Sequence, residues 1–293
     1  MRKYMKAFLT VLLIFSLVAC SQTEGTSGSE EKGETTLEKV KSEGFVTVGF
    51  ANEVPYAYAT PDGKLTGEAV EVARAVLKKM GIEEMNGVLT EFGSLIPGIQ
   101  AKRFDLITAG MYITPERAKQ VDFADPEYSI GEAIAVKTGN PLNIKSYEDI
   151  KNNSDIKVAV MSGAIQSDYL KSVGVDESQI QVVPDNPSAL AALQAGHVDV
   201  IAMTGPSLQS VLDAANDPDV ERVMDFEDPI IDGKSVRGYG ATVFRQEDDD
   251  FREAFNKELA AMKESGELLE IISQFGFTEQ ELPGDVTAEE LSK

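Results

Sequence analysis

ITAGMYITPER, residues 107–117, predicts a buried strand followed closely by the start of a helix. The apolar residues at its beginning are typical of a strand inside a sheet, and we expect the strand to break at Gly110. Tyr112 is then expected to stand exposed beyond the strand. Thr114 and Pro115 suit the N-cap and the first position of a helix. A strand that passes into a helix through so short a turn indicates an α/β protein.

The same alternation continues in both directions from this stretch. The elements expected before it are a strand at 45–50, a helix between Gly67 and Gly81, a strand at 87–92 and a helix at 95–102. The elements expected after it are strands at 156–161, 179–184 and 198–203 and helices at 166–173, 188–195 and 207–215. Strands that alternate with helices across short loops favour parallel pairing. The sequence therefore predicts two α/β lobes, each a mainly parallel sheet flanked by helices.

Two strand-like segments, 132–143 and 239–244, are expected to connect these lobes as crossovers, and a helix at 249–272 to return to the first lobe. The domain boundaries that follow are a first lobe of 36–137 plus 239–280, a second lobe of 138–238 and a polar C-terminal tail of 281–293.

The charge and the scarce cysteine and histidine argue against several classes of protein. The 293 residues carry 27 basic and 49 acidic side chains, a net charge of -22. A nucleic-acid-binding protein needs a basic surface, and so does a protein that adheres to anionic lipid. One cysteine, Cys20, and one histidine, His197, do not make a disulfide or a Cys/His metal site, so we expect no metal and no cofactor.

The N-terminal stretch MRKYMKAFLTVLLIFSLVAC has basic residues at Arg2, Lys3 and Lys6 before an apolar run at 7–19. A transmembrane helix needs about 20 apolar residues, so this shorter run predicts a signal peptide over 1–19. Its end, LVAC, resembles a bacterial lipobox, which implies cleavage before Cys20 and lipidation of that cysteine. Residues 20–35 hold no large apolar side chain and are expected to be a flexible tether. We therefore expect an extracytoplasmic lipoprotein, attached to the cell membrane through its lipid alone.

Several motifs of the lobes resemble those of the type II solute-binding proteins of bacterial ABC importers. They are the Gly67-Glu68 turn, PGIQAKRFDLITAGM, TPERAKQVDF and LQAGHVDVI. The resemblance covers nearly the whole mature chain and implies the two-lobed periplasmic-binding-protein fold. It also implies that Arg117 binds a ligand carboxylate. The residue chemistry agrees, because a guanidinium in the first turn of a helix lies beside free backbone N–H groups.

One residue differs from the usual pattern of that family, and this difference narrows the class of ligand. In its α-amino-acid binders, the strand after the Gly-x-Val-Asp turn usually ends in an aspartate that holds the ligand's ammonium group. Thr204 occupies that place here. A compact ammonium group prefers a desolvated anionic partner, so this substitution argues against an ordinary α-amino acid.

Three aromatic residues, Tyr56, Phe92 and Tyr112, follow three strands of the predicted first lobe. Open α/β sheets bind ligands at the carboxyl ends of their strands. Rings that gather there can surround a diffuse cation, each contributing roughly 0.5–2 kcal/mol when water is excluded. The sequence therefore predicts an aromatic box.

NEVPYAY, EFGSLIPG and ITAGMYITPER are similar to the corresponding segments of ectoine- and hydroxyectoine-binding proteins. The resemblance implies that Tyr56, Phe92 and Tyr112 stack on the amidinium ring of the ligand. It also implies that Glu53 accepts a ring N–H and that Arg117 and the backbone of Gly110 contact the carboxylate. In the second lobe that family has a Gly-rich turn with a hydroxyl residue. Here the turn is Ser162-Gly163-Ala164-Ile165, and the hydroxyl is missing at its expected position. We then expect Ser162, Gly163 and Ile165 to supply the contacts of the second lobe with the ligand.

We interpret the chain as a monomeric binding protein, not an enzyme, that closes on a small zwitterionic ligand and delivers it to the membrane subunits of an ABC permease. Two alternatives remain open. One is a binding protein for a polar, basic or cyclic amino acid or a betaine. The other is a dehydratase-like enzyme on the same fold, in which Glu53 is the plausible acid. His197 lies at a predicted helix end and is interpreted as a solvated charge.

Overall fold

The computed structural model describes residues 33–231 and 233–293. The predicted signal peptide, the predicted lipidation site Cys20 and most of the predicted tether lie outside the described residues. The last tether residue, Thr35, is the N-cap of helix α1 (Thr36–Glu43) and forms a capping box with Glu38. In the described part of the chain, no helix combines the length and the apolar character that a bilayer crossing requires.

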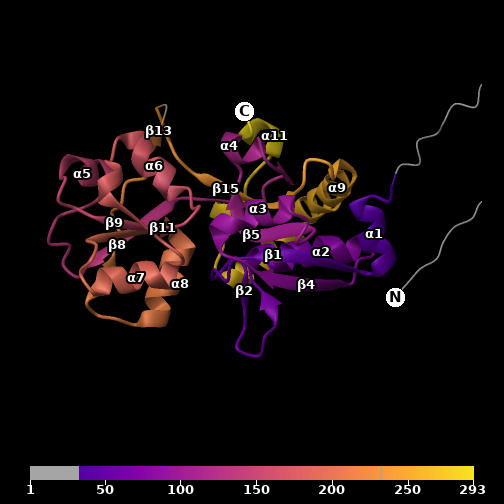
Figure 1. Ribbon diagram of the computed structural model, residues 1–293, viewed down its shortest axis with the longest axis horizontal. Helices are drawn as coiled ribbons and strands as arrows, with labels where there is room; N and C mark the ends of the chain where they lie inside the picture. The colour runs from indigo at the N-terminus through magenta and orange to yellow at the C-terminus, as the bar shows by residue number, and fades with distance from the viewer. Residues whose placement is uncertain (1–32, 232) are drawn as a thin grey trace, which may run out of the picture. The chain divides into compact units, whose positions relative to one another are not determined.

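The first lobe is built on a mixed sheet with the strand order β4-β1-β5-β15-β6, and β7 also pairs with β15. Its strands are β1 (Phe45–Phe50), β4 (Glu84–Leu89), β5 (Leu106–Tyr112), β6 (Asp122–Phe123), β7 (Tyr128–Ile130) and β15 (Gly238–Phe244). β1 runs parallel to β4 and β5, whereas β15 runs antiparallel to β5. A hairpin of β2 (Tyr58–Ala59) and β3 (Leu65–Thr66) extends from this lobe (Figure 1).

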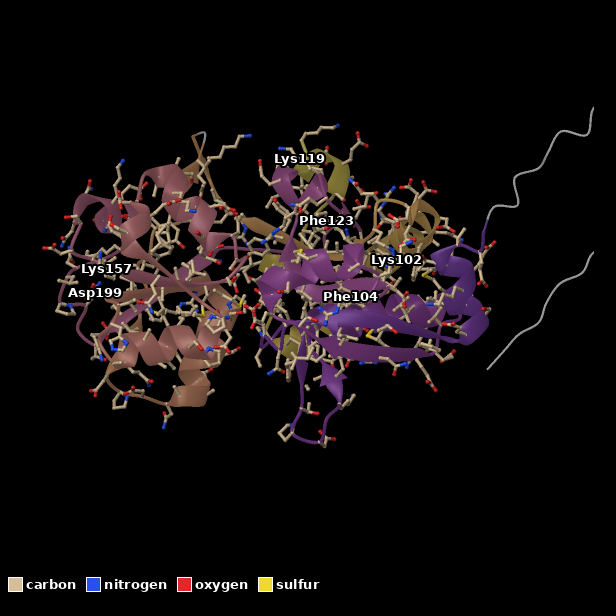
Figure 2. All side chains as sticks on the ribbon, viewed as in Figure 1. Lys102, Phe104, Lys119, Phe123, Lys157 and Asp199 are labelled. Atoms are coloured by element: carbon tan, nitrogen blue, oxygen red, sulfur yellow. The ribbon has the colours of Figure 1, made fainter. Side chains whose placement is uncertain are left out.

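Helices cover both faces of the first sheet. α2 (Glu68–Lys79), α9 (Asp249–Ser265) and α10 (Glu267–Ile272) pack with Val46 and Val48 of β1 in one apolar cluster. α3 (Leu95–Gln100) packs with Phe104 in another cluster. Phe104 is buried in this lobe (Figure 2), and a Cβ atom on Gly49 would lie 2.6 Å from its ring. A larger residue at position 49 would therefore displace Phe104.

The second lobe has the strand order β10-β9-β11-β8-β12. Its strands are β8 (Glu132–Lys137), β9 (Val158–Met161), β10 (Ile180–Val183), β11 (Val200–Thr204) and β12 (Val220–Arg222). Its helices are α5 (Tyr147–Asn152), α6 (Gln166–Val173), α7 (Asn186–Gln194) and α8 (Gly205–Ala215). Figure 1 shows α5 and α6 on one side of this sheet and α7 and α8 on the other. Alternate residues of β8 supply the two cores, Ala133 and Ala135 to one and Ile134 and Val136 to the other.

The predicted lobe boundary at residue 137 is wrong. β8 pairs antiparallel with β11 and β12, so it belongs to the second sheet. The chain therefore passes from the first sheet to the second at Gly131, between β7 and β8. It returns through a hairpin of β13 (Ile230–Ile231) and β14 (Lys234–Ser235) into β15.

Three further predictions need correction. The predicted strand at 87–92 lies at β4, three residues earlier, because Phe92 begins the turn η1 (Phe92–Ser94). The predicted helix at 249–272 is interrupted at Gly266, whose φ of 83° caps α9. The polar tail begins at the end of turn η4 (Glu279–Glu281) and forms helix α11 (Ala288–Leu291). Ala288 is 9% exposed and its N–H donates to Asp125 over 3.0 Å, so the tail packs on the first lobe.

Candidate functional site

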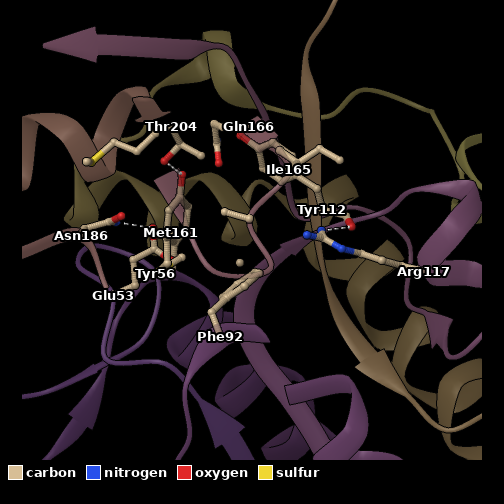
Figure 3. A pocket seen from close by; sticks show the side chains of 13 residues that line it. Glu53, Tyr56, Phe92, Tyr112, Arg117, Met161, Ile165, Gln166, Asn186 and Thr204 are labelled. Atoms are coloured by element: carbon tan, nitrogen blue, oxygen red, sulfur yellow. Dashed lines mark hydrogen bonds between the residues drawn. The ribbon is translucent and has the colours of Figure 1, made fainter. Parts of the chain in front are cut away.

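A pocket lies between the carboxyl ends of strands from the two lobes (Figure 3). Its first-lobe residues are Glu53, Tyr56, Phe92, Gly110, Tyr112 and Arg117. Its second-lobe residues are Met161, Ala164, Ile165, Gln166, Asn186, Met203 and Thr204. β1, β4 and β5 of one sheet and β9, β10 and β11 of the other all end near these residues. Parallel strands that end at one edge bring distant segments of the chain together there.

The end of β5 differs from its prediction. The strand continues through Gly110 to Tyr112, and Tyr112 is 4% exposed instead of standing free. Gly110 has a φ of 63°, and a Cβ atom there would lie 2.6 Å from the ring of Tyr56. The hydroxyl of Tyr128 donates to the carbonyl of Gly110 over 2.9 Å. Glycine is needed here because two tyrosines pack directly against the backbone.

Arg117 is held by the helix that TPER begins. Thr114 Oγ1 accepts a hydrogen bond from Arg117 N over 3.2 Å and N-caps α4 (Pro115–Ala118). The guanidinium donates to the carbonyls of Tyr112 over 2.7 Å and of Gly163 over 2.9 Å. It lies 5.7 Å from the ring centroid of Phe92.

No carboxylate of the described residues lies within ion-pair distance of Arg117, judged from the salt bridges of residues 33–231 and 233–293. Burial lowers the pKa of this guanidinium from its ordinary value. The pocket therefore contains a partly desolvated cation whose hydrogen bonds go to backbone carbonyls, and an anion would gain from joining it.

Glu53 lies on the opposite side of the pocket from Arg117 (Figure 3). Its Oε1 accepts hydrogen bonds from Asn186 Nδ2 over 3.0 Å and from Ser207 Oγ over 2.6 Å, both in the second lobe. Burial raises the pKa of Glu53, and the hydrogen bonds from Ser207 and Asn186 oppose that rise. The pocket thus carries a carboxyl group and a guanidinium at separate ends.

The three predicted aromatic residues all line the pocket. Tyr56 is 1% exposed, and its ring stacks on Tyr128 with centroids 5.3 Å apart. Phe92 is 7% exposed and also lines the pocket (Figure 3). A flat cationic group placed there would meet the negative faces of aromatic rings.

The turn after β9 only partly follows its prediction. Ile165 lines the pocket, but Ser162 and Gly163 do not. Gly163 contacts the first lobe instead, since its carbonyl accepts from Arg117 and a Cβ atom on it would lie 2.6 Å from Cα of Gly93. The two glycines allow the backbones of the two lobes to meet beside the pocket.

Sequence reasoning missed Asn186 and Gln166 as pocket residues. Asn186 begins α7 after the N-cap Asp185, and Gln166 begins α6. Each residue closely follows a strand of the second sheet, and residues at the carboxyl ends of such strands commonly bind ligands. Their place after predicted strands could therefore have identified them from the sequence. Thr204 occupies the position at which related α-amino-acid binders were expected to have an aspartate. It accepts a hydrogen bond from Tyr56 and lines the pocket.

Side chains nearly fill the pocket. The cavity that remains among them is about 30 Å³, which is room for about one or two water molecules. The contacts of Tyr56, Glu53 and Arg117 with the second lobe cross this space. A molecule as large as an amino acid would therefore enter only if the rings shift or the lobes separate.

Comparisons with known proteins agree with this architecture. Residues 46–279 match a family described as bacterial extracellular solute-binding proteins, family 3. The chain is 39% identical over 263 residues to a probable amino-acid ABC transporter periplasmic-binding protein of Sinorhizobium fredii, covering 88% of this chain and 86% of that protein. It is 27% identical over 257 residues to an L-cystine-binding protein of Escherichia coli, covering 87% and 91%.

Two solved structures extend the comparison. The crystal structure of EhuB in complex with hydroxyectoine has a TM-score of 0.81 and 37% identity, and covers 89% of this chain and 98% of that chain. The crystal structure of an ancestral amino-acid-binding protein, a precursor of cyclohexadienyl dehydratase, has a TM-score of 0.71 and 28% identity, covering 82% and 99%.

Proposed function

The chain belongs to the bacterial extracellular solute-binding proteins of family 3, and from this premise we propose that it binds ectoine or hydroxyectoine between its lobes. Closure of the second lobe would bury this zwitterion, and the closed form would deliver it to an ABC permease. The lipid anchor inferred at Cys20 would keep the protein at the outer face of the cell membrane.

The observation that carries this proposal is the arrangement of Arg117, the aromatic rings and Glu53 across one pocket. Arg117 offers a fork of N–H donors to a carboxylate. Tyr56 and Phe92 suit a delocalised ring cation, which loses less hydration than a compact ammonium group does. Glu53 can accept an N–H of that ring, because its carboxyl group is already held in place by Ser207 and Asn186.

The comparison with EhuB supports this assignment, since that protein was crystallised with hydroxyectoine. The names of the relatives as binding proteins favour binding over catalysis. Four interlobe hydrogen bonds, made by Tyr56, Glu53 and Arg117, involve the residues that would contact the ligand. Ligand binding and lobe closure would therefore be coupled through the same side chains.

A polar amino acid is the second candidate ligand. It is favoured by the relatives that are named for amino acids, and an amino acid carries the same carboxylate that Arg117 would bind. It is opposed by Thr204, which offers a hydroxyl where an anion would best hold a compact ammonium group.

The proposal is tested by calorimetric titration of the chain from Ser21 onward, which contains the whole compact unit 34–293. The ligands are ectoine, hydroxyectoine, proline, glycine betaine, arginine and glutamine. One-to-one binding of ectoine or hydroxyectoine that is tighter than that of the other four is expected. If an amino acid binds but ectoine and hydroxyectoine do not, the family assignment stands and the proposed ligand is wrong.

A further inference from the structure

Glu132 is a buried carboxyl group next to the pocket. It is 7% exposed and begins β8, where it lies directly opposite Thr204 in the antiparallel ladder with β11. Side chains of directly opposed residues project from the same face of a sheet. Thr204 lines the pocket and bonds to Tyr56, so the side chain of Glu132 is on the face of the sheet that the ligand would approach.

Gln166 connects this carboxyl group to the pocket. It is 3% exposed, lines the pocket, and donates from Nε2 to Glu132 Oε2 over 2.6 Å. With Glu132 ionised, its carboxylate only accepts hydrogen bonds, so the amide nitrogen faces Glu132 and the amide oxygen is left for another donor. Glu132 therefore sets the orientation of a pocket amide.

The second carboxyl oxygen, Glu132 Oε1, is buried and meets no hydrogen-bond donor within the described ranges. The hydroxyl of Tyr112 is buried and unpartnered in the same sense. Burial raises the pKa of Tyr112 well above its ordinary value, and the negative charge of Glu132 is the next cause. These two polar groups thus lie near each other beside the pocket, and unpaired buried groups of this kind are costly unless a partner arrives.

The charges that face Glu132 do not neutralise it. Asp228 Oδ1 accepts from the N–H of Glu132 over 2.9 Å, and Glu53 is the other acidic neighbour. Burial raises the pKa of Glu132 to about 8, the hydrogen bond from Gln166 opposes the rise, and the charges of Asp228 and Glu53 add to it. Four tyrosines that are uncharged at neutral pH also lie near Glu132, namely Tyr56, Tyr112, Tyr147 and Tyr169.

Two arginines share an adjacent groove with Glu132 but are engaged elsewhere. Arg237 donates to the side chain and the carbonyl of Ser129 over 3.1 and 2.8 Å. Arg222 donates to the carbonyl of Gly205 over 3.2 Å. Neither forms a salt bridge with Glu132 within 4.0 Å in the part of the chain that the structure describes.

From this arrangement we infer that Glu132 is the second-lobe countercharge for the cationic group of the bound solute, acting through Gln166. The Gln166 amide oxygen accepts an N–H of the ligand, and the carboxylate behind it stabilises the positive charge. This inference rests on the proposed function and adds a residue to it. Arg117 in the first lobe holds the anionic end of the ligand, and the Glu132–Gln166 pair in the second lobe recognises a cation that carries an N–H.

The inference has a signature that a purely structural residue lacks. A cation placed near Glu132 favours its ionised form, so ligand binding at pH 7 should release a proton. Ectoine affinity should accordingly increase as the pH rises from 6 to 8.5. Glycine betaine has a quaternary nitrogen without N–H, so it should bind more weakly and should depend less on Gln166.

The experiment titrates ectoine into the chain from Ser21 onward at pH 6, 7 and 8.5, in phosphate and in Tris. The difference in heat between the two buffers gives the number of protons released. Glu132→Gln should bind ectoine at least tenfold more weakly at pH 8.5 and lose most of the proton release. Gln166→Leu should weaken ectoine binding more than glycine betaine binding.

The matched control is Glu127→Gln, in which a buried glutamate with a pKa raised to about 7 is changed in the first lobe, outside the pocket. It should retain the affinity and the proton release of the unchanged protein. The variant Glu53→Gln shows how much of the proton release comes from Glu53 and not from Glu132. The inference is overturned if Glu132→Gln keeps the proton release and pH profile of the unchanged protein.

The unchanged protein provides a second test of the inference, and this test does not depend on any variant being folded. Ectoine affinity that is the same at all three pH values, with no buffer-dependent heat, also overturns the inference and leaves the proposed ligand in place. No binding of either ectoine by the unchanged protein would instead contradict the proposed function itself.

Discussion

The hydroxyl of Tyr56 in the first lobe donates a hydrogen bond to Thr204 Oγ1 in the second lobe over 2.8 Å. Tyr56 is also one of the rings that line the pocket. The side chain proposed to stack on the ligand is thus one that ties the lobes together. Glu53 combines the same two tasks through Asn186 and Ser207.

Tyr56→Phe should weaken ectoine binding modestly, because it removes the interlobe hydrogen bond and keeps the ring. A neutral hydrogen bond contributes roughly 0.5–1.5 kcal/mol, so a loss of about 2- to 12-fold in affinity is expected. Thr204→Val should produce a loss of similar size. The measurement is calorimetric titration of both single variants and the double variant.

The double variant decides whether the two hydroxyls act as a pair. Residues in direct contact show non-additive effects, so Tyr56→Phe combined with Thr204→Val should bind almost as well as either single variant. Fully additive losses would mean that the bond between Tyr56 and Thr204 does not form in the ligand-bound protein.

Arg117→Ala should weaken ectoine binding strongly, because it removes a charged partner of the ligand carboxylate. A hydrogen bond to a charged group contributes about 1.5–3 kcal/mol, which corresponds to about 10- to 150-fold in affinity. Arg117→Lys should recover little, since an ammonium group cannot reproduce the fork that now reaches Tyr112 and Gly163.

The matched control for Arg117 is Arg252→Ala. Arg252 lies on α9, pairs with Asp249 over 2.6 Å and does not line the pocket. It should leave the dissociation constant unchanged. Equal effects of the Arg117 and Arg252 substitutions would show that charge loss, and not carboxylate binding, reduces the affinity.

Phe92→Leu should reduce ectoine affinity while preserving the fold. The variant keeps an apolar side chain but removes a ring that is expected to face the cation, at a cost of roughly 0.5–2 kcal/mol. Phe226→Leu is the control, because Phe226 packs on Tyr147 in the second lobe, outside the pocket. Titrations with ectoine and proline distinguish a loss of stacking on a delocalised ring cation from a general loss of packing, which would affect both ligands equally.

Stability without ligand should fall as the pH rises from about 5 to 8. The pKa of Glu127 is raised to about 7 and that of Glu132 to about 8, in each case mainly by burial, from an ordinary value of 4.5. In this window the folded protein holds protons that the unfolded chain releases, so each group contributes a loss of up to about 1.4 kcal/mol per pH unit.

Urea unfolding at pH 5, 6, 7 and 8 measures this slope. The exposed carboxyl groups with lowered pKa values, such as Asp62 and Asp217, titrate below this window and do not offset it. Glu127→Gln should flatten the slope between pH 5 and 7. A free energy of unfolding that increases with pH over this range would contradict the raised pKa values.

Local signals explain why many elements were predicted correctly. The predicted strand at 45–50 and helix at 166–173 coincide with β1 and α6. α6 ends before Gly174, whose φ of 97° suits only glycine well, and the sequence shows that residue directly. Arg117 was placed correctly for the same reason, because its cap by Thr114 lies within one turn of helix.

Predictions failed where distant segments decide the structure. Gly110 looked like a strand end, but β15 pairs with β5 as far as Tyr112 and continues the sheet. Glu132 was assigned with the first lobe and was not considered as a site residue, although β11 and Gln166 place it beside the pocket. β15 is distant in the chain from Gly110, and β11 and Gln166 are distant from Glu132. No local sequence pattern therefore reveals these contacts.

The sequence by itself determined the α/β class, the order of most elements and the residues at the strand ends, because hydrophobic periodicity and helix caps act within a few residues. Only the tertiary structure decided which sheet β8 joins, that Asn186 and Ser207 reach Glu53, and that Gln166 turns toward Glu132. These contacts depend on backbone pairing between distant strands and on the meeting of two lobes. Backbone hydrogen bonds form between almost any residues, so the pairing of distant strands leaves little trace in the sequence.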